Sequence, residues 1–416
     1  MIILVNDNEM SISENSGGLY QNLALLRQTK GLAETNFFKA LNFDYYYLDN
    51  GHNLDALIET FSQVKDTPKP TVIHMRTLKG KGYEPAETLK EHYHYTAPFN
   101  METGASLASS PTESYAQITD DFLCDKAAQD KKIVAITAAT PTLAHNRFRN
   151  ELPAQFIDVG IAEEHAIALA SGIASQGGKP VASFYSSFIQ RTYDQLSQDL
   201  AINQNPALIL VHGSGISGSD ITHLGLFDIP LIANIPNLVY LAPTHKEEYL
   251  AMMEWGIEQN QYPVIIKVPN QEVISTGKKV NADFSTLNKY ERIIDGSKVA
   301  IIALGSFYPL GEKIHTQLQT DLGIQSTLIN PRYMTGIDQE QLTELLANHQ
   351  LVITLEDGIL DGGFGEKITR FYGDKDMKVL NFGAKKEFTD RVPVQELYER
   401  YQLTEKQVIE AIKRTI

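Results

Sequence analysis

An α/β fold made of parallel sheets covered by helices is the architecture that this sequence predicts, and two patterns support it. Short apolar runs such as KIVAIT and ALILVHG alternate with amphipathic stretches along most of the chain. These runs are apolar throughout, which is typical of parallel strands buried on both faces. The 416 residues, of which 43% are hydrophobic and 21% charged, are enough for two or three domains with separate cores.

A first domain with its linker is predicted over residues 1–105. The run IILV indicates a buried strand, LDALIETFSQVKD a helix and PTVIHMRT a second strand, and the Gly- and Lys-containing loop LKGKGYEPAE follows. The first strand runs directly into the polar segment NDNE at residues 6–9. Strands of this kind normally lie in mid-sheet, so we expect neighbours on both sides and polar ligands at its end.

Two further α/β domains are predicted, over residues 110–275 and 290–416. The strands expected in the second domain are KIVAIT, FIDVG, KPVASFY, ALILVHG, LVYLAP and PVIIKVP, with helices on AEEHAIALASGIASQG, SFIQRTYDQLSQDLAI and KEEYLAMMEWGIEQ. The third domain repeats the alternation with strands in KVAIIALGS, QSTLIN, LVITLED and KVLNFG. The chain is therefore expected to hold three successive α/β domains.

The charge balance, the length of the apolar runs and the cysteine count limit the kinds of partner and compartment that we expect. The 36 basic and 51 acidic residues give a net charge of −15, which argues against a nucleic-acid or anionic-membrane surface. Apolar runs fall short of the roughly 18 residues that a membrane span needs. The single cysteine, Cys124, excludes an internal disulfide framework and suits a reducing compartment, so we expect a cytoplasmic protein.

The segment FIDVGIAEEHA places polar groups where α/β proteins bind ligands. A strand ending in Asp158 passes through Gly160 into a helix whose first turn holds Glu163, Glu164 and His165. Acidic residues at a helix start also complement the helix dipole, and for Glu164 that structural role is the favoured interpretation.

Several long segments carry a resemblance to a known family. DVGIAEEHA, YSSFIQRTYDQ, GSDITHLGLFDI, LVNDNEMSISEN and RTLKGKGYEPAE stand in one order along the chain. Together they resemble the 1-deoxy-D-xylulose-5-phosphate synthases, thiamine-diphosphate enzymes of the transketolase group, and the similarity extends over nearly all of the chain. The resemblance implies three-layer domains of the thiamine-diphosphate-binding fold, the second of them the pyrimidine-binding domain, followed by a transketolase-like C-terminal domain.

The resemblance also implies a cofactor site. Glu163 matches the acid that exchanges a proton with the N1′ nitrogen of the aminopyrimidine, and burial against the ring is expected to raise its pKa. Phe188 matches the aromatic residue that stacks on the pyrimidine. For the Mg²⁺ that bridges the diphosphate, the implied ligands are the Asn8 side chain and the Met10 carbonyl oxygen, both of the oxygen type that Mg²⁺ prefers.

For the substrates, the resemblance implies pyruvate, which loses CO₂, and D-glyceraldehyde 3-phosphate as the acceptor, in a step that leads to isoprenoid precursors and to thiamine. The acceptor needs proton donors at its carbonyl group and cations at its phosphate. The residues that match family acceptor-site positions are Tyr185, Arg191, Asp220 and His223, with His94 reaching the same cleft from the linker side.

The sequence departs from the family pattern at the acceptor site. Gly213 stands where the family has a phosphate-binding arginine, and Lys267 replaces a second one. A lysine lacks the bidentate fork of arginine, so the exchange weakens phosphate recognition. One residue is also deleted between Asp220 and His223, which is expected to shift the acid relative to the histidine. These departures leave the identity of the acceptor open.

The family's other Mg²⁺ ligand, the aspartate of a Gly-Asp-Gly motif, has no counterpart in these 416 residues. We therefore expect an N-terminally truncated synthase, and three explanations stand side by side: an incomplete product of a longer gene, a subunit that pairs with a polypeptide carrying the missing half, or an inactive remnant. Enzymes of this group are generally homodimers. Rival assignments are a transketolase, the β subunit of a 2-oxo-acid dehydrogenase, or a folded fragment that acts only as a partner protein.

Overall fold

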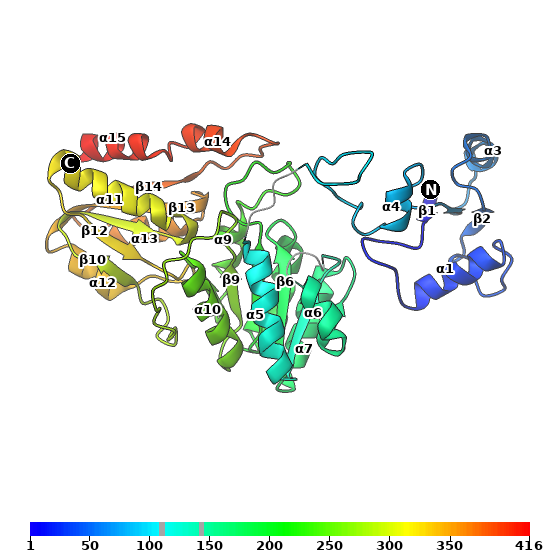
Figure 1. Cartoon of the computed structure of the whole chain (residues 1–416), viewed down its shortest axis with the longest axis horizontal. Helices are drawn as coiled ribbons and strands as arrows, with labels where there is room; N and C mark the ends of the chain where they lie inside the picture. The colour runs from blue at the N-terminus through cyan, green and yellow to red at the C-terminus, as the bar shows by residue number, and fades with distance from the viewer. Residues whose placement is uncertain (108–112, 141–144) are drawn as a thin grey trace. The chain divides into compact units, whose positions relative to one another are not determined.

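The computed structural model describes residues 1–107, 113–140 and 145–416 and falls into two compact units, Met1–Ser110 and Pro111–Ile416 (Figure 1). The predicted α/β class is confirmed, because the sheets of both units are built from parallel strands, with one antiparallel exception in the C-terminal sheet. Among the described residues, every helix is too short or too polar to cross a bilayer.

The first unit is a small three-stranded parallel sheet in the order β1-β3-β2. Its elements are β1 (Ile2–Asp7), α1 (Gly18–Gln28), α2 (Phe37–Ala40), β2 (Asp44–Leu48), α3 (Leu54–Val64), β3 (Thr71–Arg76) and α4 (Glu84–Thr88). The sequence-based expectation that β1 has neighbours on both sides is not met within the described residues, where it pairs only with β3. Ile2 and Leu4 on β1 are accordingly 37% and 48% exposed.

The second unit begins with a six-stranded parallel sheet in the order β5-β4-β6-β7-β9-β8. Its elements are α5 (Tyr115–Gln129), β4 (Ile133–Thr137), α6 (Asn146–Glu151), β5 (Phe156–Asp158), α7 (Glu163–Ser175), β6 (Lys179–Tyr185), α8 (Tyr193–Gln195), β7 (Leu208–His212), α9 (Asp228–Ile232), β8 (Val239–Leu241), α10 (Lys246–Glu258) and β9 (Val264–Lys267).

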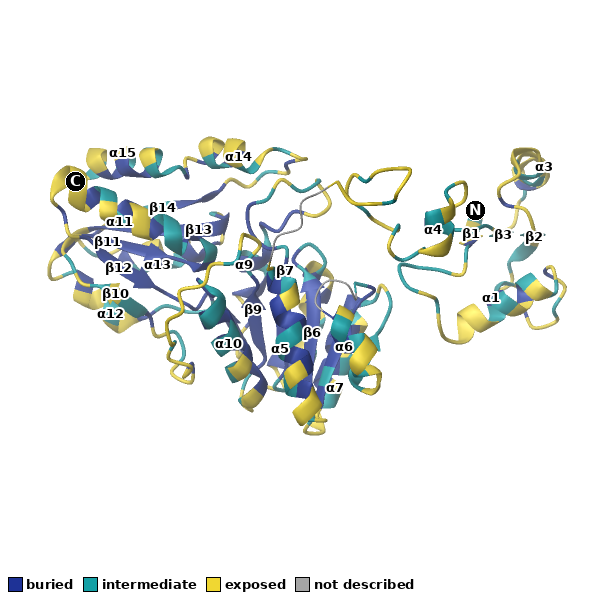
Figure 2. Ribbon diagram, in the orientation of Figure 1, coloured by how far each residue is buried: buried dark blue, intermediate teal, exposed yellow. Residues whose placement is uncertain are grey.

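Both faces of this sheet are covered, as continuous apolar strands require. Along β7, Leu208 and Leu210 pack into one core cluster with α5 and α10, whereas Ile209 and Val211 pack into another with α7. Figure 2 shows the buried strands between more exposed helices. This alternation leaves the ends of the strands as the places where polar side chains can gather.

Residues 187–202, predicted as a single helix, form a broken segment. A 3₁₀ turn at Ile189–Thr192 leads through α8 into a π-helical turn at Leu196–Ala201. The Thr192 hydroxyl donates to the Ile189 carbonyl oxygen at 2.7 Å, and the Ser197 hydroxyl donates to the Asp194 carbonyl oxygen at 3.0 Å. Such side-chain bonds compete with regular helical bonds, and hydrophobic periodicity does not report them.

The C-terminal sheet has the order β10-β12-β11-β13-β14, and β10, which the sequence did not predict, runs antiparallel to β12. Its elements are β10 (Glu291–Ile294), β11 (Lys298–Ala303), α11 (Tyr308–Leu322), β12 (Thr327–Asn330), α12 (Gln339–Leu345), β13 (His349–Ile359), α13 (Phe364–Tyr372), β14 (Lys378–Ala384), α14 (Val394–Arg400) and α15 (Glu405–Thr415). One apolar cluster includes residues of both sheets of the second unit, among them Ile209 and Ile302, so the two sheets share a core.

Candidate functional site

Glu163 lies at the first position of α7, just beyond the end of β5. Its residue is 3% exposed, and its Oε2 atom lies 3.0 Å from a guanidinium nitrogen of Arg191, which comes from the broken segment after β6. Glu164 lies 3.7 Å from the same guanidinium group and is partly exposed. The predicted acid is therefore buried at the carboxyl-terminal edge of the sheet, with its charge balanced by one half-exposed arginine.

Three of the predicted side chains form an aromatic cluster next to this edge. The ring of Phe188 lies 5.7 Å from that of Tyr185 and 5.4 Å from that of His223, centroid to centroid, and both pairs are edge-to-face. Tyr185 and His223 are 6.4 Å apart and perpendicular. The structure therefore brings Tyr185, Phe188 and His223 together, although they come from the end of β6 and from the loop after β7.

Asp220 and His223 contact each other in the loop after β7. The Asp220 carboxylate lies 3.1 Å from His223 Nδ1 and accepts a 2.5 Å hydrogen bond from the Thr222 hydroxyl. The bonds from the Thr222 hydroxyl, from His223 and from the Thr222 backbone N–H hold the pKa of Asp220 well below its usual value. Asp220 and His223 are therefore in direct contact in this loop.

Gly213 lies directly beside Tyr185. Its φ is +64°, and a Cβ added there would stand 3.0 Å from the Tyr185 ring. A side chain at this position would strain the backbone and press on the tyrosine. The local conformation at residue 213 therefore favours glycine.

Lys267, predicted to bind the acceptor phosphate, is differently placed. Its residue is 5% exposed, and its ammonium group lies 2.8 Å from Asp228 and 3.4 Å from Asp357. Burial alone lowers the pKa of Lys267, but the two carboxylates more than offset this and raise it. Because its charge is already neutralised in the interior, we correct the prediction and leave Lys267 out of the phosphate-binding groups.

The predicted metal ligands lie in the first unit, in a compact turn after β1. The Asn8 side-chain oxygen accepts the Met10 backbone N–H at 3.1 Å, and the neighbouring Asp7 carboxylate is held by His74 at 2.7 Å and by Arg27 at 2.5 Å. Within the described residues, no group of three or more His, Cys, Asp or Glu side chains could hold a metal. The Asn8 side-chain oxygen and the Met10 carbonyl oxygen are of the ligand type that Mg²⁺ prefers.

His94 lies in the same unit, and its side-chain partner was missed by the sequence reasoning. The Lys79 ammonium group lies 3.1 Å from His94 Nδ1 and donates a 2.5 Å hydrogen bond to the Ser11 carbonyl oxygen, next to the turn that holds Asn8 and Met10. Lys79 belongs to the quoted segment RTLKGKGYEPAE, but the 68 residues that separate it from Ser11 give no sign of the contact.

Three family models match successive stretches of the chain. The family "Transketolase, pyrimidine binding domain" matches residues 113–275, and "Transketolase, C-terminal domain" matches residues 288–408. The family described as 1-deoxy-D-xylulose-5-phosphate synthase matches residues 25–77.

Solved structures show the same fold. A structure titled "Split gene transketolase, inactive beta4 tetramer" has a TM-score of 0.62 and 22% identity, over 72% of this chain and 96% of that one. A transketolase mutant from Pichia stipitis has a TM-score of 0.60 and 13% identity, over all of this chain and 71% of that one.

Curated relatives match along the whole chain. The 1-deoxy-D-xylulose-5-phosphate synthase of Pseudoalteromonas translucida is 33% identical over 453 aligned residues, which cover 100% of this chain and 72% of that protein. The synthases of Vibrio atlanticus and Alkaliphilus oremlandii are each 34% identical over 72% of their length and 99% and 100% of this chain. This chain therefore belongs to the 1-deoxy-D-xylulose-5-phosphate synthase family.

Proposed function

We propose that this chain is the pyrimidine-binding and C-terminal part of a thiamine-diphosphate-dependent transferase that condenses pyruvate with D-glyceraldehyde 3-phosphate and releases CO₂. The observation that carries the proposal is Glu163, buried at the start of α7 beside Arg191, in a chain whose full length matches synthases. A buried carboxyl group at the carboxyl edge of a parallel sheet is a suitable partner for a heterocyclic nitrogen.

In the proposed mechanism, thiamine diphosphate supplies the carbon that adds to pyruvate and stabilises the negative charge left by decarboxylation. Glu163 holds and returns the proton at the N1′ nitrogen of the cofactor's aminopyrimidine. Phe188 presents its ring to the pyrimidine. Tyr185 and His223, within the same aromatic cluster, donate hydrogen bonds to the acceptor carbonyl group, and Asp220 orients the His223 ring through Nδ1.

Arg191 has two roles in this proposal. Its guanidinium group pairs with Glu163 in the present structure, and its side chain is 47% exposed. With Glu163 engaged by the cofactor, the Arg191 guanidinium group would be free to bind the acceptor phosphate in a bidentate manner. This assignment follows from Gly213 having no side chain and Lys267 being buried.

For the metal, we propose that Asn8 and the Met10 carbonyl group contribute two Mg²⁺ ligands and that an aspartate outside these 416 residues completes the site. A longer chain, or a partner polypeptide in the assembly, would carry this aspartate, and a homodimer is the proposed assembly.

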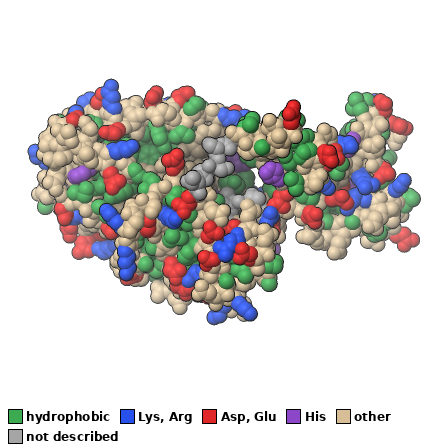
Figure 3. Space-filling view, in the orientation of Figure 1, with side chains coloured by type: hydrophobic (Ala, Val, Ile, Leu, Met, Phe, Trp, Pro, Cys, Tyr) green, Lys and Arg blue, Asp and Glu red, His purple; other side chains and the backbone are tan. Residues whose placement is uncertain are grey.

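Neither nucleic acid nor membrane is a proposed partner, because the net charge is −15 and basic and acidic side chains are interspersed in Figure 3. The single cysteine supports a cytoplasmic location.

Calorimetry and an activity assay test the proposal together. The 416-residue chain alone should bind thiamine diphosphate weakly, without dependence on Mg²⁺, and should turn over pyruvate and glyceraldehyde 3-phosphate negligibly. A chain extended with a segment bearing Gly-Asp-Gly should release CO₂ from pyruvate.

In that extended chain, Glu163→Gln should lower turnover by about 100-fold or more, whereas Glu164→Gln, the matched control one residue away, should leave turnover nearly unchanged. Equal activity in wild type and Glu163→Gln would refute the role of the acid. Tight Mg²⁺-dependent binding by the 416 residues alone would refute the external metal ligand.

A further inference from the structure

Lys79 connects two parts of the first unit that the sequence keeps far apart. Its ammonium group donates to the Ser11 carbonyl oxygen at 2.5 Å, which lies in the turn after β1. The same group lies 3.1 Å from Nδ1 of His94. The loop that carries Lys79 is itself held, because the Leu78 backbone N–H donates to His52 Nε2 at 2.7 Å.

The contact determines which nitrogen of His94 carries the proton. A lysine ammonium group has three donors and no acceptor, so Nδ1 of His94 must be the acceptor in this bond. A neutral imidazole that accepts at Nδ1 carries its hydrogen on Nε2. His94 therefore offers an N–H donor on the side of the ring turned away from Lys79.

The surroundings agree with a neutral ring. Partial burial, and then the Lys79 charge, lower the pKa of His94 below its usual value. Burial also lowers the pKa of Lys79, with Glu91 acting in the opposite direction and Lys90 in the same one. The His94 backbone N–H donates to the Glu91 carbonyl oxygen at 3.2 Å, which keeps the residue in its turn.

We propose that Lys79 is a positioning residue. It holds His94 as the neutral Nε2–H tautomer and links it to Ser11, in the turn that also holds Asn8 and Met10. His94 thereby acts as a hydrogen-bond donor toward a substrate oxygen, a carbonyl or carboxylate group, and not as a base. This inference rests on the proposed function only for the identity of that substrate; the tautomer itself follows from the contact with Lys79.

Nitrogen-15 NMR of ring-labelled histidines in the full 416-residue chain tests the inference without any turnover. The His94 signals are identified by their loss in His94→Gln. In the wild type at pH 7.5, Nδ1 should be unprotonated and Nε2 protonated. Lys79→Arg should preserve this state, because arginine also only donates.

Two further variants should change the state of the ring. Lys79→Met should move the His94 pKa upward, toward its ordinary value, since a positive neighbour is removed. Lys79→Glu should place the hydrogen on Nδ1, because a carboxylate accepts. The matched control is Lys81→Met, from the same Gly- and Lys-containing loop, whose ammonium group lies 4.0 Å from Glu87; it should leave the His94 signals unchanged.

The outcomes separate this inference from the proposed function. A charged or Nδ1–H His94 in the wild type, or identical His94 signals in wild type and Lys79→Met, would overturn the positioning role whether or not the chain binds thiamine diphosphate. Conversely, the predicted tautomer in a chain whose extended form shows no turnover would retain the role of Lys79 and refute only the proposed function.

Discussion

At the scale of single residues, the candidate site depends on a buried charge with one visible partner. Glu163 is 3% exposed, and among the described residues its carboxylate has Arg191 within ion-pair distance, at 3.0 Å. An isolated buried carboxylate is costly, so the half-exposed arginine stabilises the folded unit as long as no ligand occupies the site. In the proposed mechanism this pair would separate once Glu163 engages the cofactor.

Removing Arg191 should therefore destabilise the chain in the absence of cofactor. We expect Arg191→Met to lower the free energy of unfolding by about 1–2 kcal/mol, because the Glu163 carboxylate is left unpaired. Urea denaturation without thiamine diphosphate measures this loss. In the double variant Glu163→Gln/Arg191→Met most of the loss should disappear, and Glu164→Gln should change little. If Arg191→Met lowers the free energy of unfolding equally in the wild type and in Glu163→Gln, the ion pair is not the cause of the loss.

Sequence reasoning identified most of this site but not its internal partners. Tyr185, Phe188, Asp220 and His223 were named from matched motifs, and the structure brings them together with Glu163 and Arg191 at one end of the sheet. Lys267 illustrates the limit of motif matching: the motif predicts a residue's place in the chain, while its neighbours Asp228 and Asp357 come from α9 and β13. Burial and ion pairing depend on those neighbours.

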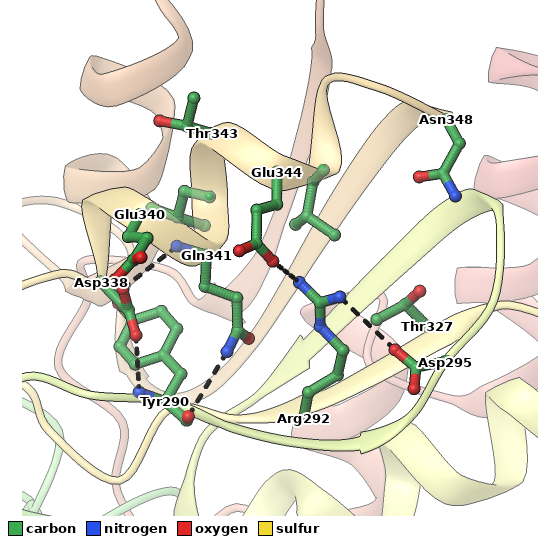
Figure 4. A network of polar contacts seen from close by, with 12 residues as sticks. Tyr290, Arg292, Asp295, Thr327, Asp338, Glu340, Gln341, Thr343, Glu344 and Asn348 are labelled. Atoms are coloured by element: carbon green, nitrogen blue, oxygen red, sulfur yellow. Dashed lines mark hydrogen bonds and ion pairs between the residues drawn. The ribbon is translucent and has the colours of Figure 1, made fainter.

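At the scale of elements, Asp338 joins two pieces of the C-terminal sheet layer (Figure 4). Its carboxylate caps α12 by accepting the Gln341 backbone N–H at 3.1 Å, and it accepts the Tyr290 backbone N–H at 3.1 Å just before β10. Arg292 on β10 adds a 2.8 Å bond to Glu344 on α12. These contacts explain how a short, partly exposed antiparallel strand stays at the edge of the sheet.

Replacing this cap should loosen both elements at once. Asp338→Ala is expected to cost about 2 kcal/mol of unfolding free energy, because a helix cap and a buried backbone donor both lose their acceptor. Thermal or urea unfolding measures it, and hydrogen exchange should rise at Tyr290 and Gln341. Glu340→Ala, which removes an exposed partner of Lys289, is the control and should cost under about 1 kcal/mol. A small loss in Asp338→Ala would contradict the shared cap.

At the scale of the molecule, two buried histidines make the second unit sensitive to acid. His145 is fully buried, with Nε2 at 2.9 Å from the Ser183 hydroxyl, and burial lowers its pKa to about 4. Burial and the neighbouring His145 lower the pKa of His212 to about 3. Because both folded pKa values lie below the ordinary value near 6.5, their neutral forms support the fold above that pH, and this support is lost as the pH falls toward 4 and 3.

His212→Leu should flatten this acid sensitivity. His212 Nε2 has no hydrogen-bond partner among the described residues, so the substitution leaves no polar group newly unpaired there. Below about pH 6, the decline in unfolding free energy should be shallower than in the wild type by up to about 1.4 kcal/mol per pH unit. Urea titrations at a series of pH values measure the slope. His165→Gln, at an exposed position of α7, should keep the wild-type slope; an unchanged slope in His212→Leu would refute the assignment.

Local periodicity and long contiguous motifs were enough to predict the α/β class, most of the strands and helices, and the family. The folded chain was needed to show that β1 pairs on one side within the described residues and that β10 runs antiparallel. It was also needed to show that Lys267 is buried between Asp228 and Asp357 and that Lys79 reaches both Ser11 and His94. Those outcomes depend on contacts between residues far apart in the chain, whose energies are set by burial and by the direction of each donor and acceptor.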